Sequence, residues 1–377
     1  MKFLAPLVFC IAFTADSLGI DQIPETIDTR ILPTPSPHWL WVDDVVFNYM
    51  GDGRASLIDG DTGSYLGMLS TGVGFMTLGL PSDQSEIYSV ETYYTRGLRG
   101  DRTDVVTIYD VAELKPIGEI EVPPKRHMSL PTLTNFVLTD DNRFLLIYNF
   151  TPAQSVSVVD VKARKFLGEI ETTGCAQIYV TGKRTFQMLC QDGSTMRITL
   201  DDNGGAKNKA FSEPFFNPAK DPIHDDGARL GDSWYFISYT GDVYQLDSSS
   251  GEPTFPESWS LLNVEDRAAS WLPGGGQFLA IHKPTKRLFV AMHQGGDFSH
   301  KDPGTEIWIY DLVTQQRLQR ITANNVVTSV AVTRDDKPLM FTAFLGSTDI
   351  EIYDATSGEH LRTVGHMGAG PSALQVP

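Results

Sequence analysis

Cysteine is scarce in this chain of 377 residues, and the motifs of several common enzyme classes are missing. The three cysteines are Cys10, Cys175 and Cys190, and they are too few and too widely spaced for a structural zinc site. The eight histidines form no His-Glu-x-x-His motif, and the chain has no Gly-x-Ser-x-Gly nucleophile elbow. The sequence therefore predicts no catalytic residues and no metal or cofactor site in this chain.

Basic residues are also few. The chain has 30 Lys and Arg against 47 Asp and Glu, which gives a formal net charge of −17. Nucleic-acid binding needs a basic face that neutralises phosphates, so a nucleic-acid partner is excluded. After the first residues, no apolar run is long enough to cross a bilayer, and no membrane association is expected.

The N-terminus has the pattern of a secretory signal peptide over residues 1–17. Lys2 supplies a positive charge, Phe3–Phe13 is a short apolar run, and Ala15–Ser17 offers small residues for cleavage. The alternative is an ordinary buried strand. Residues 18–38 are rich in Pro, Thr and Asp and are expected to form an irregular N-terminal arm, followed by a folded domain over 39–377.

The rest of the chain repeats one sequence pattern. In each copy, a β-branched apolar run ends in Asp, and a polar turn then leads to a second short run. The clearest copy is Val105–Asp110 followed by Lys115–Ile120. Alternating apolar residues favour strands, and an Asp side chain suits a turn because it accepts backbone N–H groups two residues on. The aspartates that end the seven copies are Asp59, Asp110, Asp160, Asp201, Asp247, Asp311 and Asp354.

These copies are 41–64 residues apart, which is the period of a β-propeller blade. The sequence therefore predicts an all-β, seven-bladed β-propeller. The N-terminal blade has only three strand patterns, at Trp39–Val46, Ser56–Ile58 and Tyr65–Leu69. The C-terminal stretch Ser372–Val376 has no blade after it, so we expect it to complete the N-terminal blade and close the ring.

Cys175 and Cys190 form an even pair in a chain predicted to be exported, which favours a disulfide. Cys175 is expected to begin the inner strand of its blade and Cys190 to end the next strand, and these ends are neighbours in an antiparallel hairpin. Two unpaired buried thiols are the alternative.

The longest interval between copies contains two insertions. Ser260–Trp271 has the pattern of a short helix, and His293–His300 forms a loop. Insertions in a repeat protein gather on one face and often make contacts with partners. The two histidines of the loop raise the possibility of a metal site, but no acidic ligand pattern accompanies them, which favours a solvated loop.

Several stretches resemble the heavy subunit of quinoprotein amine dehydrogenases, the family of methylamine and aromatic amine dehydrogenases. The stretches are Arg102–Val106, Val122–Arg126, the Cys175 and Cys190 pair, Trp259–Asp266 and Trp271–Gly275. The resemblance runs from about Trp39 to the C-terminus and is closer to the aromatic amine enzyme. The chain departs from longer members of the family in its short N-terminal arm.

The resemblance implies a periplasmic protein that pairs with a small cysteine-rich light subunit in a two-heavy, two-light assembly. The light subunit is expected to carry tryptophan tryptophylquinone and the catalytic base, so the six tryptophans of this chain are read as packing residues. The assembly is expected to oxidise primary, aromatic or aralkyl amines to aldehyde and ammonia and to pass electrons to a small blue copper protein.

The resemblance also points to one residue of this chain, Phe47, as a wall of the substrate channel. The alternative is that Phe47 fills a gap between blades. For the whole chain, two other functions stay open: a free-standing periplasmic binding or scaffold propeller, and a propeller hydrolase that holds a metal in its tunnel. The second is weaker because no carboxylate cluster can be read from the spacings.

Overall fold

The computed structural model describes residues 31–44, 51–74 and 77–377. The chain divides into the units Met1–Ile31 and Leu32–Pro377, and the description below concerns the second. The predicted signal peptide, residues 1–17, and most of the predicted arm, residues 18–38, fall outside the described residues, so those boundaries stay predictions.

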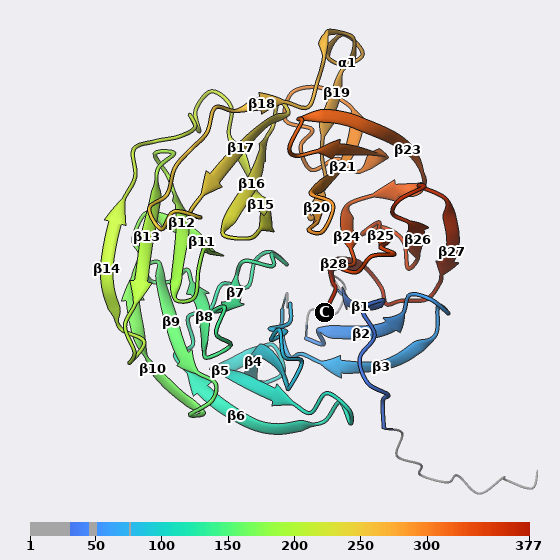
Figure 1. Ribbon diagram of the computed structural model, residues 1–377. Coiled ribbons are helices and arrows are strands. Elements are labelled where there is room, and N and C mark those ends of the chain that lie inside the picture. The colour runs from blue at the N-terminus through green and yellow to red at the C-terminus, as the bar shows by residue number, and fades with distance from the viewer. Residues whose placement is uncertain (1–30, 45–50, 75–76) are drawn as a thin grey trace, which may run out of the picture. The chain divides into compact units, whose positions relative to one another are not determined.

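Seven antiparallel sheets stand around a central axis, and they form the predicted β-propeller (Figure 1). We number the blades in chain order. From the axis outwards, blade 1 has the order β28-β1-β2-β3, and blade 7 has the order β24-β25-β26-β27. The strands are β1 (Trp39–Asp44), β2 (Arg54–Asp59), β3 (Tyr65–Ser70), β4 (Ile87–Arg96), β5 (Arg99–Tyr109), β6 (Pro116–Val122), β7 (Phe136–Leu138), β8 (Phe144–Asn149), β9 (Ser155–Asp160), β10 (Lys165–Glu171), β11 (Cys175–Val180), β12 (Thr185–Cys190), β13 (Thr195–Leu200), β14 (Ala206–Phe211), β15 (Ile223–Leu230), β16 (Ser233–Ser238), β17 (Asp242–Asp247), β18 (Trp259–Ser260), β19 (Trp271–Pro273), β20 (Leu279–His282), β21 (Arg287–Gln294), β22 (Gly304–Asp311), β23 (Gln316–Val327), β24 (Ser329–Val332), β25 (Leu339–Ala343), β26 (Ile350–Asp354), β27 (His360–Val364) and β28 (Pro371–Gln375).

The repeated aspartates occupy one equivalent position in all seven blades, at the turn from the third strand to the outermost strand. Each carboxylate accepts a hydrogen bond from the backbone N–H two residues later, at 2.7–3.1 Å. In Asp354, for example, Oδ1 also accepts the N–H of Ser357 at 2.7 Å. The turn prediction is confirmed, and the repeat exists because each blade needs this turn.

The ring closes as predicted. Strand β28 pairs antiparallel with β1, with Val42 opposite Leu374, and supplies the inner strand that blade 1 lacks. The carboxylate of Asp44 fastens this joint, because it accepts the N–H of Ala369 at 3.0 Å and that of Gly370 at 2.7 Å. No inner edge of blade 1 is therefore left open to pair with another chain.

Two glutamine side chains connect blade 1 to blades 6 and 2 near the joint. The Gln277 amide donates to the carbonyl of Leu374 at 2.9 Å, and its oxygen accepts the N–H of Leu374 at 2.8 Å. Gln375 makes the same pair of hydrogen bonds to the backbone of Leu78. Blades 6, 1 and 2 are thus tied through side-chain amides that satisfy backbone groups facing the axis.

The hydrophobic core lies between adjacent blades. The largest cluster joins blades 5, 6 and 7 around Trp308, which is fully buried, and the guanidinium groups of Arg317 and Arg320 lie 4.3 and 4.6 Å from its ring. All six tryptophans pack in such clusters, which agrees with the reading of them as packing residues: Trp39, Trp41, Trp234, Trp259, Trp271 and Trp308.

Two blades depart from the regular four strands. Blade 2 has three strands, and an isolated bridge between Gly79 and Tyr88 takes the place of its inner strand. Blade 6 has a divided inner strand, because β19 and β20 both pair with β21. The segment before β19 contains the predicted helix, α1 (Val264–Ala268), which Asn263 begins by accepting the N–H of Asp266 in a capping box.

In the described part of the chain, no helix has the length and apolar character that a membrane crossing requires.

The closure predicts a stability effect at Asp44. Asp44→Ala leaves the N–H groups of Ala369 and Gly370, the second of them buried, without their acceptor, so the free energy of unfolding should fall by about 1–3 kcal/mol. Urea denaturation measures it. Asp297→Ala, at an exposed position in a loop, is the control and should change stability by less than about 0.5 kcal/mol. Equal effects of the two substitutions would contradict the role of Asp44.

Candidate functional site: the insertion face and the tunnel

One face of the ring carries the features that the sequence singled out. In each antiparallel blade, the loop between the second and third strands and the connection to the next blade lie at the same end of the strands. The two insertions are such segments, between β18 and β19 and between β21 and β22, and the Cys175 and Cys190 pair lies at that end of blade 4. We call this the insertion face, and the prediction that the insertions share a face is confirmed.

Phe47 lies in the chain between β1 and β2, outside the described residues, so its predicted role in a substrate channel stays a prediction. β1 and β2 are the second and third strands of blade 1, and the chain between them is described again from Gly51. The described end of this connection approaches blade 2, because a Cβ placed on Gly51 would lie 3.1 Å from Leu98 Cδ2.

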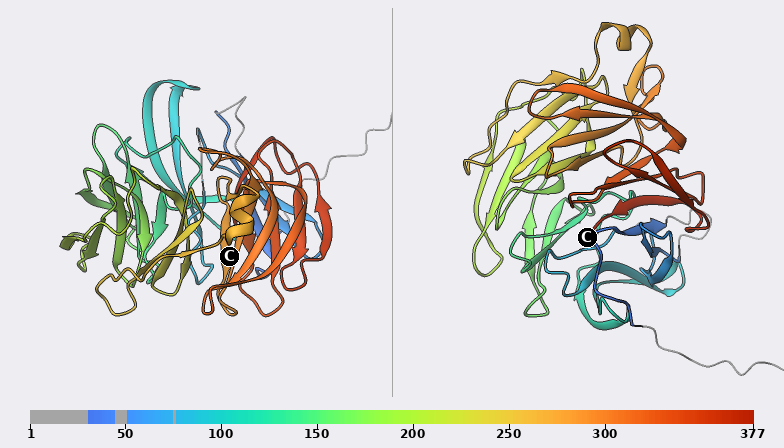
Figure 2. Two further views of the ribbon diagram at one scale, coloured as in Figure 1. Left: turned by 90° about the horizontal axis from the view of Figure 1, so that it is seen from above. Right: turned by 45° about the vertical axis from the view of Figure 1, so that its right-hand side comes forward.

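Leu98 lies in the turn of the hairpin formed by β4 and β5, which rises from the ring on the insertion face (Figure 2). Leu98 is 56% exposed and Tyr93, on the same hairpin, is 44% exposed. Leu98 therefore places an exposed apolar side chain at the tip of a projecting hairpin, a position open to contact with another protein.

A buried carboxylate holds the base of this hairpin. Glu91 accepts hydrogen bonds from the hydroxyls of Tyr93 at 2.5 Å, Thr107 at 2.7 Å and Tyr109 at 2.7 Å. Burial raises the pKa of Glu91, and these hydrogen bonds act in the opposite direction. The Tyr109 hydroxyl also donates to the carbonyl of Ser70, which ties the hairpin to blade 1.

A second buried group joins two of the stretches that carry the family resemblance. Asp104 accepts two hydrogen bonds from Arg102, at 2.8 and 2.7 Å, and one from the backbone N–H of Arg126 at 3.3 Å. The Arg126 guanidinium donates to Thr92 and to the carbonyl of Val73, and burial lowers the pKa of Arg126 to about 10. Arg102–Val106 and Val122–Arg126 are therefore one structural unit that fixes the hairpin on the ring.

The axis of the ring contains two chambers lined by the inner strands. The upper chamber, towards the insertion face, has a volume of about 240 Å³, and the lower chamber about 230 Å³. Leu133, Asp226 and Gln277 line both and mark the waist between them. Asp225 and Lys301 line the upper chamber. The side chains of the lower chamber that carry positive charge are Arg229, Lys283 and Arg334.

The two histidines of the loop between β21 and β22 take part in side-chain packing. His293 Nε2 lies 2.8 Å from Ser299 Oγ, and the His300 ring stacks on Tyr239 with 3.7 Å between ring centroids. In residues 31–44, 51–74 and 77–377, no group of three or more His, Cys, Asp or Glu is arranged to hold a metal ion. The structure gives the metal hypothesis at this loop no support.

His224 lies beneath the same loop and is 1% exposed. Its ring centroid is 4.2 Å from that of Phe278 and 5.5 Å from that of His300. Burial lowers the pKa of His224 well below its ordinary value, and the positive charge of Lys301 lowers it further.

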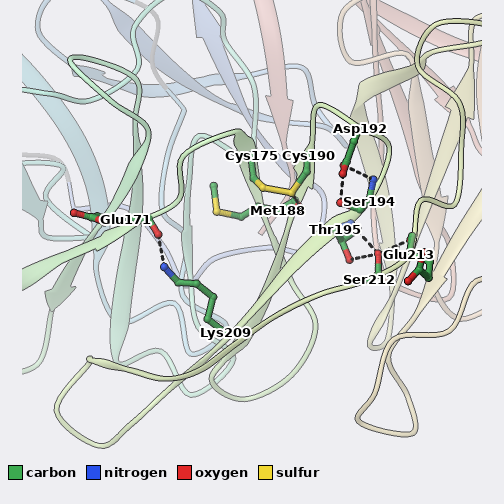
Figure 3. The surroundings of a disulfide bond; sticks show 10 residues. All are labelled: Glu171, Cys175, Met188, Cys190, Asp192, Ser194, Thr195, Lys209, Ser212 and Glu213. Atoms are coloured by element: carbon green, nitrogen blue, oxygen red, sulfur yellow. Dashed lines mark hydrogen bonds between the residues drawn. A yellow bond between two sulfur atoms is a disulfide. The ribbon is translucent and has the colours of Figure 1, made fainter.

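The predicted disulfide is confirmed. Cys175 and Cys190 are bonded across the hairpin of β11 and β12, and their Cα atoms are 3.9 Å apart (Figure 3). The following turn is ordered by Asp192, whose carboxylate accepts the hydroxyl of Ser194 at 2.6 Å and its N–H at 3.0 Å. The bridge therefore joins the first two strands of blade 4 at the insertion face.

The sequence reasoning missed Asp226, Glu91 and Gln277. Asp226 follows His224 and Asp225, and this run of three titratable residues was a visible signal in the sequence. Glu91 and Gln277 gave no signal, because most of their partners lie in another strand or another blade.

These observations define a class of protein: a seven-bladed β-propeller that carries its insertions, its disulfide and a projecting hairpin on one face. The sequence pattern of the methylamine dehydrogenase heavy chain (MADH) family matches residues 41–376. The chain belongs to this family, which confirms the resemblance seen in the sequence.

Individual relatives agree. The methylamine dehydrogenase heavy chain of Paracoccus versutus is 29% identical over 346 residues, which cover 91% of this chain and 80% of the relative. The heavy chain of Methylorubrum extorquens is 30% identical over 324 residues, which cover 84% and 78%.

Solved structures at lower identity support the fold alone. Dihydro-heme d1 dehydrogenase NirN is 14% identical, with a TM-score of 0.57 over 93% of this chain and 77% of that one. AztD from Citrobacter koseri is 13% identical, with a TM-score of 0.51 over 89% and 98%.

The disulfide leads to a stability prediction. Cys175→Ser should lower the free energy of unfolding by about 2–4 kcal/mol, because a closed loop of 15 residues restricts the unfolded chain. Thermal unfolding under oxidising conditions measures the loss. A reductant should reproduce it in the wild type and leave Cys175→Ser unchanged. An unchanged melting temperature in the variant would count against a stabilising bridge.

The buried His224 leads to a pH prediction. Its folded pKa lies below 6.5, so the unfolded state binds more protons once the pH falls below about 6.5, and stability decreases there. His224→Phe keeps an aromatic ring packed against Phe278 and removes the group that binds a proton. Between pH 8 and pH 5 the wild type should therefore lose more stability than the variant, by up to about 1.4 kcal/mol for each pH unit.

Denaturant unfolding across that pH range measures the difference between wild type and His224→Phe. The comparison isolates His224, because His293 and His300, whose pKa values are also lowered by burial, are present in both proteins. Parallel stability curves would show that His224 contributes nothing to the acid response.

Proposed function

We propose that this chain is the heavy subunit of a periplasmic amine dehydrogenase. The observation that carries the proposal is the family match over 41–376, which covers all seven blades. The heavy chains of Paracoccus versutus and Methylorubrum extorquens are named as parts of methylamine dehydrogenases. A heavy subunit requires a light partner, and the projecting hairpin on the insertion face supplies a surface suited to one.

In this proposal the light subunit is small and cysteine-rich, and it joins the heavy subunit in a two-heavy, two-light assembly. It carries tryptophan tryptophylquinone, whose chemistry when present is the two-electron oxidation of a primary amine. The six tryptophans of this chain fit a role without cofactor, since they pack in the cores between blades. The reaction consumes a primary amine and water and releases an aldehyde and ammonia, and two electrons pass singly to a small blue copper protein.

The contribution of this chain is to hold the light subunit and to wall the path of the substrate. The exposed apolar side chains of Leu98 and Tyr93 support docking on the hairpin. Phe47 is proposed as the side chain that faces the substrate, with a preference for aromatic or aralkyl amines, because an aromatic wall favours an aromatic substrate by shape and stacking.

A free-standing periplasmic binding propeller is the second candidate. The two chambers along the axis favour a binding role, because a propeller that serves only as a scaffold needs no such chambers. The two candidates differ in assembly. The heavy subunit forms a stable complex with a light subunit, and the binding propeller stays alone.

Co-expression tests the first candidate. The chain produced alone should show no quinone absorption and no amine oxidation. Co-expression with a light subunit and its maturation proteins should give both, in a complex that elutes as two heavy and two light chains. Amine oxidation by the isolated chain, or failure of a mature light subunit to bind, would exclude the proposal.

Phe47 leads to a prediction about specificity. In the active complex, Phe47→Ala should lower kcat/KM for benzylamine by about tenfold and change that for methylamine much less, because the aromatic contact is lost for the aromatic substrate alone. Phe298→Ala is the control, since it removes an aromatic side chain that is 86% exposed in the loop between β21 and β22. Steady-state kinetics with both amines measures the ratio, and an equal loss for both amines would contradict a role in selection.

A further inference from the structure

We propose that the upper chamber of the tunnel binds a small organic ammonium ion, with the carboxylate of Asp226 as its counter-ion and an apolar wall around its body. The site is separate from the oxidation of amines and goes beyond the proposed function, because it needs only residues of this chain. It would hold an amine near the insertion face whether or not a light subunit is present.

The first support is the state of Asp226. The residue is 6% exposed, it lines both chambers, and its Oδ2 has no hydrogen-bond partner among the described residues. Burial and the neighbouring Asp225 raise the pKa of Asp226 well above its ordinary value, and the positive charge of Lys301 opposes this shift. An ammonium group placed against the carboxyl favours its ionised form, so binding of the cation and ionisation of Asp226 are coupled. A buried carboxyl oxygen without a partner costs stability, so a donor that reaches it is bound favourably.

The second support is the arrangement of charge at the chamber. Lys301 is the cation that lines it, and its Nζ lies 3.6 Å from Asp225 Oδ1. This ion pair uses the carboxylate nearer the mouth. Asp226, deeper at the waist, is not part of this ion pair, and its Oδ2 remains without a hydrogen-bond partner among the described residues.

The third support is the wall. Leu130, Pro131, Leu133 and Leu345 line the upper chamber. Most of the surface that these and the other lining residues present to the chamber is apolar, and its volume of about 240 Å³ admits a ligand larger than a few water molecules. An apolar chamber with one buried acidic group selects a ligand with an apolar body and a single cationic head.

Asp43 shows that burial alone does not make such a site. Its two carboxylate oxygens also lack partners, and it is 2% exposed, but it lines neither chamber. Asp43 is therefore a matched control for Asp226, because the same substitution at both positions removes one buried carboxylate from the same protein.

The test is isothermal titration of benzylammonium into the full chain without a light subunit, at neutral pH and low salt. The wild type should bind in a saturable manner. Asp226→Asn should weaken binding by at least about tenfold, the effect of losing a charged hydrogen-bond acceptor. Asp43→Asn should stay within about twofold of the wild type. Benzyl alcohol, which has the same shape without charge, should bind weakly and should not distinguish Asp226→Asn from the wild type.

A second variant keeps the test decisive if Asp226→Asn does not fold. Gly276 lines the upper chamber, and a Cβ placed on it would approach only the carbonyl oxygen of Thr328, at 3.8 Å. Gly276→Leu should therefore fold, fill the chamber and abolish binding. Absence of saturable binding to the wild type, or unchanged binding to Asp226→Asn or to Gly276→Leu, would overturn the proposal. None of these results depends on whether a light subunit yields an active enzyme.

Discussion

The pairing of β28 with β1 is the constraint on which the rest of the structure depends. A propeller blade packs only on its two neighbours, so the ring closes only where the first and last segments of the chain pair with each other. Asp44 holds the C-terminal segment to blade 1, and Gln277 and Gln375 tie it to blades 6 and 2. The chambers exist because this joint brings the first and last parts of the chain together at the axis.

The fold could be predicted from the sequence because its signals are local. Each of the seven aspartates accepts a hydrogen bond from an N–H two residues away, so the same short sequence pattern recurs in every blade. Cys175 and Cys190 end adjacent strands of one hairpin, and Asn263 and Asp266 cap a helix within four residues. A pattern confined to a few neighbouring residues can be read without knowing what surrounds it.

The site could be predicted only in outline because its interactions are not local. Gln277 contacts Leu374, which lies 97 positions later in the chain. The residues that line the chamber around Asp226 come from several blades. The three hydroxyls that donate to Glu91 come from both strands of a hairpin, and no sequence motif predicts the length of this hairpin. The burial of Asp226 and the lack of a hydrogen-bond partner for its Oδ2 are properties of the folded ring.

The central claim is that this chain is a heavy subunit whose chemistry resides on a partner. The most direct measurement is intact mass spectrometry of the native protein isolated from its own source together with whatever elutes with it. The account predicts a small, cysteine-rich companion with a cross-linked tryptophan pair, in equal number to this chain. A single species at the mass of this chain alone, at every salt concentration, would contradict the account and favour the free-standing binding propeller.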